Sequence, residues 1–173
     1  MRRIIIDKEN VDIKKIAFGF PWKGSVPCYN FRSPNEVVLA EDISKLTGKE
    51  DIETVVIGCD LDDYSFLQDM VNLRQLYIYY GKNLNDISFV ENLTNLTQIC
   101  ILESNIGNLI HLNNMLDKMY KIIEADPRKK LVMGMEAICI NSTNKNLDGS
   151  KLLDHGHYIS EVIINDKALV KLG

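Results

Sequence analysis

The chain has 173 residues, 46% of them hydrophobic and 25% charged, and its formal net charge at pH 7 is −4. This length and apolar content suit one continuous core, so we expect residues 1–173 to form a single domain. The net negative charge argues against nucleic-acid binding, because nucleic-acid binders concentrate Lys and Arg on one face.

Neither a leader nor a membrane segment is expected. The amino terminus, MRRIIIDKEN, has a shorter apolar run than the about 7–15 residues of a secretory leader, and no other run approaches the about 18 that a membrane helix requires. We therefore expect a cytoplasmic protein, although a chain whose leader had been removed would look the same. The cysteines form no CxxC pair and are expected to be free thiols; they are Cys28, Cys59, Cys100 and Cys139.

The first predicted element is a short strand over residues 2–6 (RRIII), which would cover an open end, so that residues 1–12 form an amino-terminal cap. Ile13, Ile16 and Phe18 then predict the first strand of a series. The segment 19–39 interrupts that series. Its prolines and aromatic residues predict an ordered inserted loop.

The chain then alternates two kinds of apolar segment. In each strand the apolar residues are spaced three and then two apart, and a second block such as LDDYSFL follows. Where one unit follows another directly, the next strand begins six residues after the block ends. With residues 13–18, the pattern predicts six units within residues 13–164. The other strand triplets are Ile52/Val55/Ile57, Leu73/Leu76/Ile78, Leu96/Ile99/Ile101, Met135/Ile138/Ile140 and Ile159/Val162/Ile164.

The blocks are expected to form short helical turns. One position in them carries Asp or Asn, whose side chains accept hydrogen bonds from free backbone N–H groups at the start of a turn. A structural role is favoured over a carboxylate site, because one residue per unit makes a column and does not converge. These residues are Asp42, Asp63, Asp86 and Asn108.

A second insertion is predicted over residues 112–130, and it contains one longer helix, because its apolar residues fall at helical spacing. Asp126-Pro127 should end it, because the residue before proline avoids helical geometry. We place this helix on the convex side, with its apolar stripe in the core and its lysines in a solvated face. At the carboxyl terminus, ISEVIINDKALVKL predicts a hairpin turning at 165–167, with 165–173 as a cap.

The runs NLRQLYIYYGKNLNDISFV and NLTNLTQICILESNIGNL resemble the leucine-rich repeat family, in its bacterial internalin-like variety. The resemblance is carried by residues 52–112. It implies an α/β solenoid with about six parallel strands on the concave face, and short turns and the longer helix on the convex face. It also implies a non-enzymatic protein-binding module. The family's inward asparagine is replaced by Asp60, Gly81 and Ser104, so irregular coils are expected.

The strand residues between the inward apolar ones face the concave surface, because side chains alternate along a strand. Exposed apolar patches usually bind something, and Tyr and Trp dominate interface energies. We therefore predict a protein or peptide ligand on this face. The predicted contact residues are Val56, Tyr77, Tyr79, Tyr80, Leu102 and Trp22. The alternative is that residues 19–36 fold across the sheet and bury it, Trp22 included.

Catalysis has little support, since no nucleotide-binding, metalloprotease or hydrolase motif occurs. We expect no enzyme, no cofactor and no metal. The alternative is a hydrolase or metal-dependent enzyme that uses the repeat as a scaffold, with Cys139, Asp154, His155 and His157 as its site. Within the binding hypothesis, small size and acidic charge suggest an immunity or inhibitory partner for a basic toxin. The pattern specifies no oligomeric state.

Overall fold

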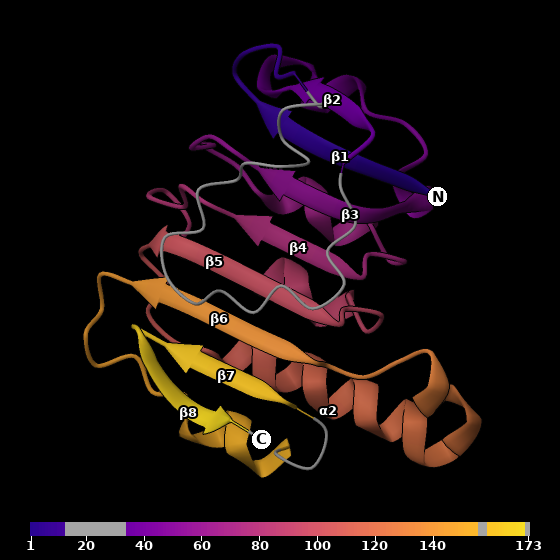
Figure 1. The fold of residues 1–173 in the computed structure, drawn as a ribbon, viewed down its shortest axis with the longest axis vertical. Helices are drawn as coiled ribbons and strands as arrows, with labels where there is room; N and C mark the ends of the chain where they lie inside the picture. Colours follow the sequence, from indigo (N-terminus) through magenta and orange to yellow (C-terminus); the bar gives the residue numbers. More distant parts are fainter. Residues whose placement is uncertain (13–33, 156–158, 172–173) are drawn as a thin grey trace.

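The computed structural model describes residues 1–12, 34–155 and 159–171, which form an α/β fold around one eight-stranded sheet (Figure 1). The strand order is β2-β1-β3-β4-β5-β6-β7-β8, and every neighbouring pair is parallel except β7 and β8. The strands are β1 Arg2–Asp7, β2 Glu36–Leu39, β3 Ile52–Ile57, β4 Gln75–Ile78, β5 Gln98–Ser104, β6 Ala137–Ser142, β7 Glu161–Ile164 and β8 Lys167–Lys171.

One α-helix and several 3-10 turns connect the strands. The predicted blocks at 40–46, 61–67, 84–90 and 147–153 each contain a turn, as the sequence indicates. The helical elements are η1 Ala40–Lys45, η2 Lys49–Asp51, η3 Ser65–Asp69, η4 Ser88–Asn92, α2 Ile110–Ala125, η5 Pro127–Leu131 and η6 Ser150–His155. Among the described residues, no helix is long and apolar enough to cross a membrane.

The predicted strand register is confirmed from β3 to β7. Leu76 of β4 lies opposite Val55 of β3 and Ile99 of β5, and Ile99 lies opposite Ile138, which lies opposite Val162. Every second residue of these strands therefore points to the same side of the sheet. The carboxyl-terminal hairpin is also confirmed: β7 and β8 are antiparallel, and Asn165 and Asp166 form the turn with positive φ angles.

The start of the sheet differs from the prediction. β1 pairs with β3 on one side and with β2 on the other, so residues 2–7 occupy the place predicted for the strand at 13–18. Since β4 holds the other edge of β3, the pairing of residues 13–18 with β3 is wrong; those residues themselves lie outside the described part. β2 falls within the segment predicted as an inserted loop, which is therefore wrong for residues 36–39.

The physical reason is burial on both faces. Ile4 and Ile6 point into one apolar cluster, whereas Ile5 points into the other. A parallel strand buried on both sides can be a continuous apolar run, and RRIII is such a run, so it forms a full strand of the sheet and not a cap. Met1, Ile4 and Ile6 also have the three-then-two spacing that predicted a strand at residues 13–18.

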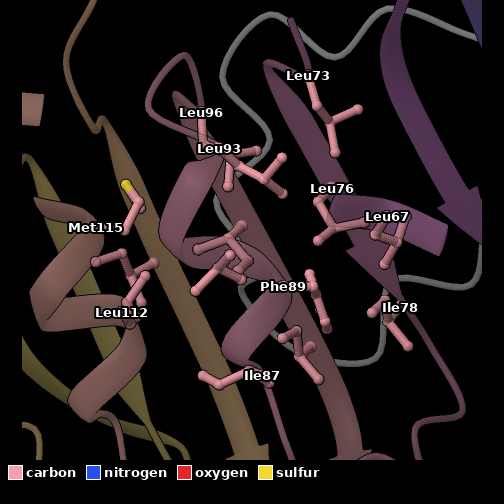
Figure 2. Packing of buried hydrophobic residues seen from close by; sticks show 14 of the residues in the cluster. Leu67, Leu73, Leu76, Ile78, Ile87, Phe89, Leu93, Leu96, Leu112 and Met115 are labelled. Atoms are coloured by element: carbon pink, nitrogen blue, oxygen red, sulfur yellow. The ribbon is translucent and has the colours of Figure 1, made fainter. Parts of the chain in front are cut away.

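The larger apolar cluster, which we call the first core, lies between one side of the sheet and the turns with α2. Leu67 of η3, Leu76 of β4 and Leu112 of α2 are completely buried there (Figure 2). Each such side chain stabilises the fold by about 1.5–3 kcal/mol relative to exposure. Every described helix or turn with buried side chains contributes them to this cluster.

Helix α2 begins at Ile110 and ends at Ala125, and Asp126 closes it as predicted. Its apolar stripe belongs to the first core, as expected. The helix is also held by Glu91 of η4, whose Oε1 accepts hydrogen bonds from Asn114 Nδ2 at 2.9 Å and lies 2.7 Å from His111 Nδ1. The buried residues of the stripe are Leu112, Met115, Leu116, Met119, Tyr120 and Ile123.

Three of the four predicted caps lie at the start of a turn. In each, the side-chain oxygen accepts a hydrogen bond from the backbone N–H two residues later, at 2.7–3.1 Å. Asp42 differs: it lies inside η1 and accepts from Lys45 Nζ at 2.6 Å. The capping residues are Asp63, Asp86 and Asn108.

Asparagine side chains link successive units at both ends of the strands. Before the strands, Asn72 Nδ2 donates to Glu50 O and Asn95 Nδ2 to Val71 O, both at 2.9 Å. After the strands, Gly81 and Ser104 stand where the repeat resemblance leads us to expect asparagine, and other asparagines make the links. These are Asn105 to Lys82 O, Asn144 to Gly107 O and Asn165 to Asn144 O.

Candidate protein-binding face

The side of the sheet away from α2 carries a second apolar cluster, which we call the second face. In its central row each residue lies opposite the next on the neighbouring strand. The central row consists of Ile5, Val56, Tyr77, Cys100, Cys139 and Ile163. Tyr79 and Leu102 extend this cluster toward the carboxyl ends of the strands, and Val11 and Val37 pack against it. The second face is therefore apolar across the middle of the sheet.

The predicted contact residues differ in accessibility. Val56 and Tyr77 are completely buried in the complete chain, and Tyr79 is nearly so. Leu102 is half-buried, whereas Tyr80, the next residue after Tyr79, is 45% exposed. The structure thus brings Val56, Tyr77, Tyr79 and Leu102 together in one cluster. Trp22 and the alternative cover by residues 19–36 lie outside the described residues.

A polar row borders the cluster toward the amino ends of the strands. Thr54 Oγ1 donates to Gln75 Oε1 at 3.1 Å, and the Tyr77 hydroxyl donates to Gln98 Oε1. Gln98 Nε2 in turn donates to Glu136 Oε2 at 3.2 Å. Buried polar groups that bond to one another in this way fix the side chains that take part. The ring of Tyr77 is therefore anchored at its hydroxyl.

Two thiols lie side by side in the central row. Cys100 of β5 pairs in register with Cys139 of β6, and a side-chain hydrogen bond from Cys100 lowers the pKa of the Cys139 thiol, against the opposing effect of burial. Cys59 belongs to the first core, where burial raises the pKa of its thiol. All three are free thiols, as expected; Cys28 lies outside the described residues.

Carboxylates gather in the segments at the carboxyl ends of the strands, and we call this group the acidic rim of the second face. They outnumber the lysines of the same segments, which are Lys8, Lys82 and Lys145. The carboxylates of the acidic rim are Asp7, Glu9, Asp60, Asp62, Glu103 and Asp166. Such a concentration of one sign attracts ligands of the opposite charge. Next to Leu102, Glu103 has a positive φ of 52°, an uncommon conformation that often marks functional sites.

Part of the acidic rim is ordered by amide side chains. Asn83 Nδ2 lies 3.3 Å from Asp60 Oδ2 and from Asp62 Oδ1, so one amide bridges two carboxylates. In the same way, Asn141 Nδ2 donates to Asp166 at 3.3 Å. The carboxylates are thereby held in place at the end of the second face. The sequence pattern missed this rim, whose signal is the acidic residues that follow several predicted strands, such as Asp60, Glu103 and Asp166.

The residues of the enzyme alternative do not converge. His155 stacks on Tyr120 of α2, with ring centroids 5.2 Å apart, and its Nε2 lies 3.3 Å from Asp117 Oδ1. Tyr120 belongs to the first core, whereas Cys139 belongs to the second face, so the sheet separates Cys139 from His155. Asp154 is exposed, and His157 lies outside the described residues. Within the described ranges, no group of three or more metal-ligating residues occurs.

Comparison of the chain with protein-family models, with curated proteins and with solved structures found no match. The resemblance to leucine-rich repeats therefore rests on the residues that carry it. We therefore infer function from the geometry of the second face and its acidic rim.

Proposed function

We propose that this chain is a non-enzymatic protein-binding module of the leucine-rich repeat kind, and that its ligand is a basic protein or peptide. The ligand binds at the carboxyl-end border of the second face, where Tyr80 and Leu102 meet the acidic rim. The observation that carries the proposal is that half-buried Leu102 of the second face and exposed Tyr80, the residue after Tyr79 of that face, lie in segments that also carry carboxylates.

Three features support the repeat architecture. Successive strands are parallel and in register, a helical turn follows most of them, and asparagine side chains bond to the backbone of the preceding unit. Equivalent residues, such as Asn72 and Asn95, recur at a separation of 23 positions. Each unit would then bury its apolar side only by stacking on its neighbours, which is the physical basis of a solenoid.

Burial divides the residues of the proposed site into a buried group and an accessible group. Tyr77 and Val56 are buried and, in the case of Tyr77, hydrogen-bonded, so they form a rigid floor. Tyr80 and Leu102 are accessible enough to contact a ligand directly. Partly exposed aromatic and aliphatic anchors supply most of the binding energy in interfaces, while surrounding charges steer the partner and select it.

The acidic rim favours a basic partner over an acidic one. Asp60 and Asp62 bond to Asn83, three residues after Tyr80, Glu103 follows Leu102, and the whole chain is negatively charged. A small acidic protein that covers a basic surface is suited to an immunity or inhibitory role, in which it neutralises a basic toxin or enzyme. This role is the specific form of binding that we propose.

The experiment captures partners of the tagged chain from a lysate of the source organism, identifies them, and measures binding of the purified partner by titration calorimetry. The test variant is Tyr80→Ala/Leu102→Ala. We expect at least about tenfold weaker binding, because loss of an interface anchor costs more than about 1 kcal/mol. Binding should also weaken as salt concentration rises, because salt screens the acidic rim.

A matched control carries Val71→Ala/Ile110→Ala, since Val71 and Ile110 are exposed apolar residues outside the second face, at 44% and 55% exposure. Both variants are first checked for an unchanged melting curve. If the control loses affinity and the test variant does not, the ligand binds elsewhere. If the affinity does not depend on salt concentration, the carboxylates of the acidic rim do not contribute to binding.

A further inference from the structure

Cys100 and Cys139 are the central residues of neighbouring parallel strands. They lie opposite each other in the register of β5 and β6, and both belong to the second face. Neighbouring strands lie about 4.8 Å apart, and disulfides join Cα atoms about 4.4–6.8 Å apart. A bond between the two sulfurs therefore requires no separation or sliding of the strands.

We propose that Cys100 and Cys139 form a redox-active pair, which a peroxide oxidises to an intrachain disulfide while the protein stays folded. The two residues occupy paired register positions on neighbouring strands and share one apolar cluster. The pair therefore supplies an attacking thiol beside a resolving thiol.

The chemistry takes two steps. The Cys139 thiolate attacks one oxygen of hydrogen peroxide, the O–O bond breaks, a sulfenic acid forms, and the departing hydroxide takes up a proton to become water. The Cys100 sulfur then attacks the sulfenic sulfur, the S–O bond breaks, and the Cys100 proton leaves with the oxygen as a second water. Two thiols lose two electrons in total, and one peroxide accepts them.

We assign the attacking role to Cys139, which is the more exposed of the two at 6% against 3%, and the resolving role to Cys100. The thiolate is the nucleophile, and the hydrogen bond from Cys100 lowers the pKa of Cys139. Cys59 offers an internal comparison, because it is about as buried, at 7% exposure against 3% for Cys100 and 6% for Cys139. It lies in the first core, and burial together with Asp7 raises the pKa of its thiol.

Oxidation would act on the second face itself. Cys100 lies opposite Tyr77 on one side, and Cys139 lies opposite Ile163 on the other, so the bond would form in the middle of the apolar row. The connection between β5 and β6 also contains α2 and η5. A disulfide here would tie the two ends of that connection together.

The test treats the full-length protein with hydrogen peroxide under native conditions and maps its peptides without reduction. We expect a mass loss of about 2 Da, a linked Cys100–Cys139 peptide, and full reversal by a dithiol reductant. Cys59 should remain free and react with an alkylating agent only after unfolding. Circular dichroism recorded on the oxidised protein should keep the folded signal.

Two variants separate the roles of the pair. Cys100→Ser should stop the reaction at a sulfenic acid on Cys139, which dimedone traps, whereas Cys139→Ser should leave Cys100 largely unreacted. The proposal is overturned if Cys59 oxidises as fast as the pair in the wild-type protein, or if the disulfide appears only under denaturing conditions. Because the wild-type mapping decides this, the test holds even if a variant folds poorly.

Discussion

The two faces of the sheet are both apolar, but they are built in different ways. The first core is closed by the turns and the helix that follow the strands in sequence, such as η3, η4 and α2. The second face takes its described side chains from the strands themselves and from the segments around Val11 and Val37. The segments that connect successive strands account for burial in the first core. The second face depends instead on the hydrogen bonds of its polar row and on the groups that contact its border.

The largest effect is expected from a cavity in the first core. Leu76→Ala should lower the free energy of unfolding by about 2–5 kcal/mol, because Leu76 is completely buried between the sheet and the turns. Urea unfolding measures this loss. Val71→Ala, at an exposed position, should change it by less than about 0.5 kcal/mol. A loss of less than about 1 kcal/mol for Leu76→Ala would contradict the proposed core.

A smaller effect is expected on the second face from Tyr77→Phe. The substitution keeps the ring but removes the hydroxyl that bonds to buried Gln98, so about 1–3 kcal/mol of stability should be lost. Urea unfolding again gives the value. Tyr80→Phe is the matched control, since Tyr80 is partly exposed, and should cost little. Equal, negligible losses for both would mean that Tyr77 is not anchored as described.

The contact between η4 and α2 predicts that the stability of the fold depends on pH. Hydrogen bonds from Asn114 and His111 lower the pKa of Glu91 to about 2, from an ordinary value of 4.5. Because the folded pKa is the lower one, Glu91 stabilises the fold above about pH 4.5, and this contribution is lost as pH falls toward about 2.

Glu91→Gln should therefore reduce stability at neutral pH and flatten its decline between about pH 4.5 and pH 2. Unfolding curves recorded across that range measure both effects. Glu124→Gln, at an exposed position on α2, serves as the control and should keep the wild-type slope. An unchanged slope in Glu91→Gln would show that this carboxylate does not hold the helix.

The smallest effect is expected from metal removal. The His155 ring stacks on Tyr120 and its Nε2 contacts Asp117, and the sheet separates His155 from Cys139. A chelator should therefore leave the melting temperature unchanged, and elemental analysis should find less than one zinc per chain. Stoichiometric zinc whose removal destabilises the protein would favour the enzyme alternative.

The strands from β3 to β7 could be predicted because each buries one row of residues in the first core, which leaves a regular spacing such as Leu76 and Ile78. β1 was predicted as a cap, because residues 13–18 show the same spacing as the other strands and spacing alone does not decide which segment pairs with β3. β2 lay inside the insertion predicted over residues 19–39, and its four residues carry too little pattern to separate a strand from a loop.

The candidate site was only partly accessible to the same reasoning. Alternation along β4 correctly assigns Tyr77 and Tyr79 to one face, but it does not determine exposure, which depends on distant packing. As a result, Tyr77 is a buried residue with an anchored hydroxyl, and Tyr80 is the accessible one. The link from Gln98 to Glu136 crosses from β5 to the segment before β6, a contact that sequence spacing does not reveal.

The most direct measurement is hydrogen–deuterium exchange of the chain with and without its captured partner. The account predicts that the partner slows exchange at residues 79–81 and 102–104, where β4 and β5 end beside the acidic rim. Exchange in η3 and η4, on the opposite side of the sheet, should be unchanged. Protection of η3, η4 or α2, with none at residues 79–81 and 102–104, would contradict the claim that the border of the second face binds the ligand.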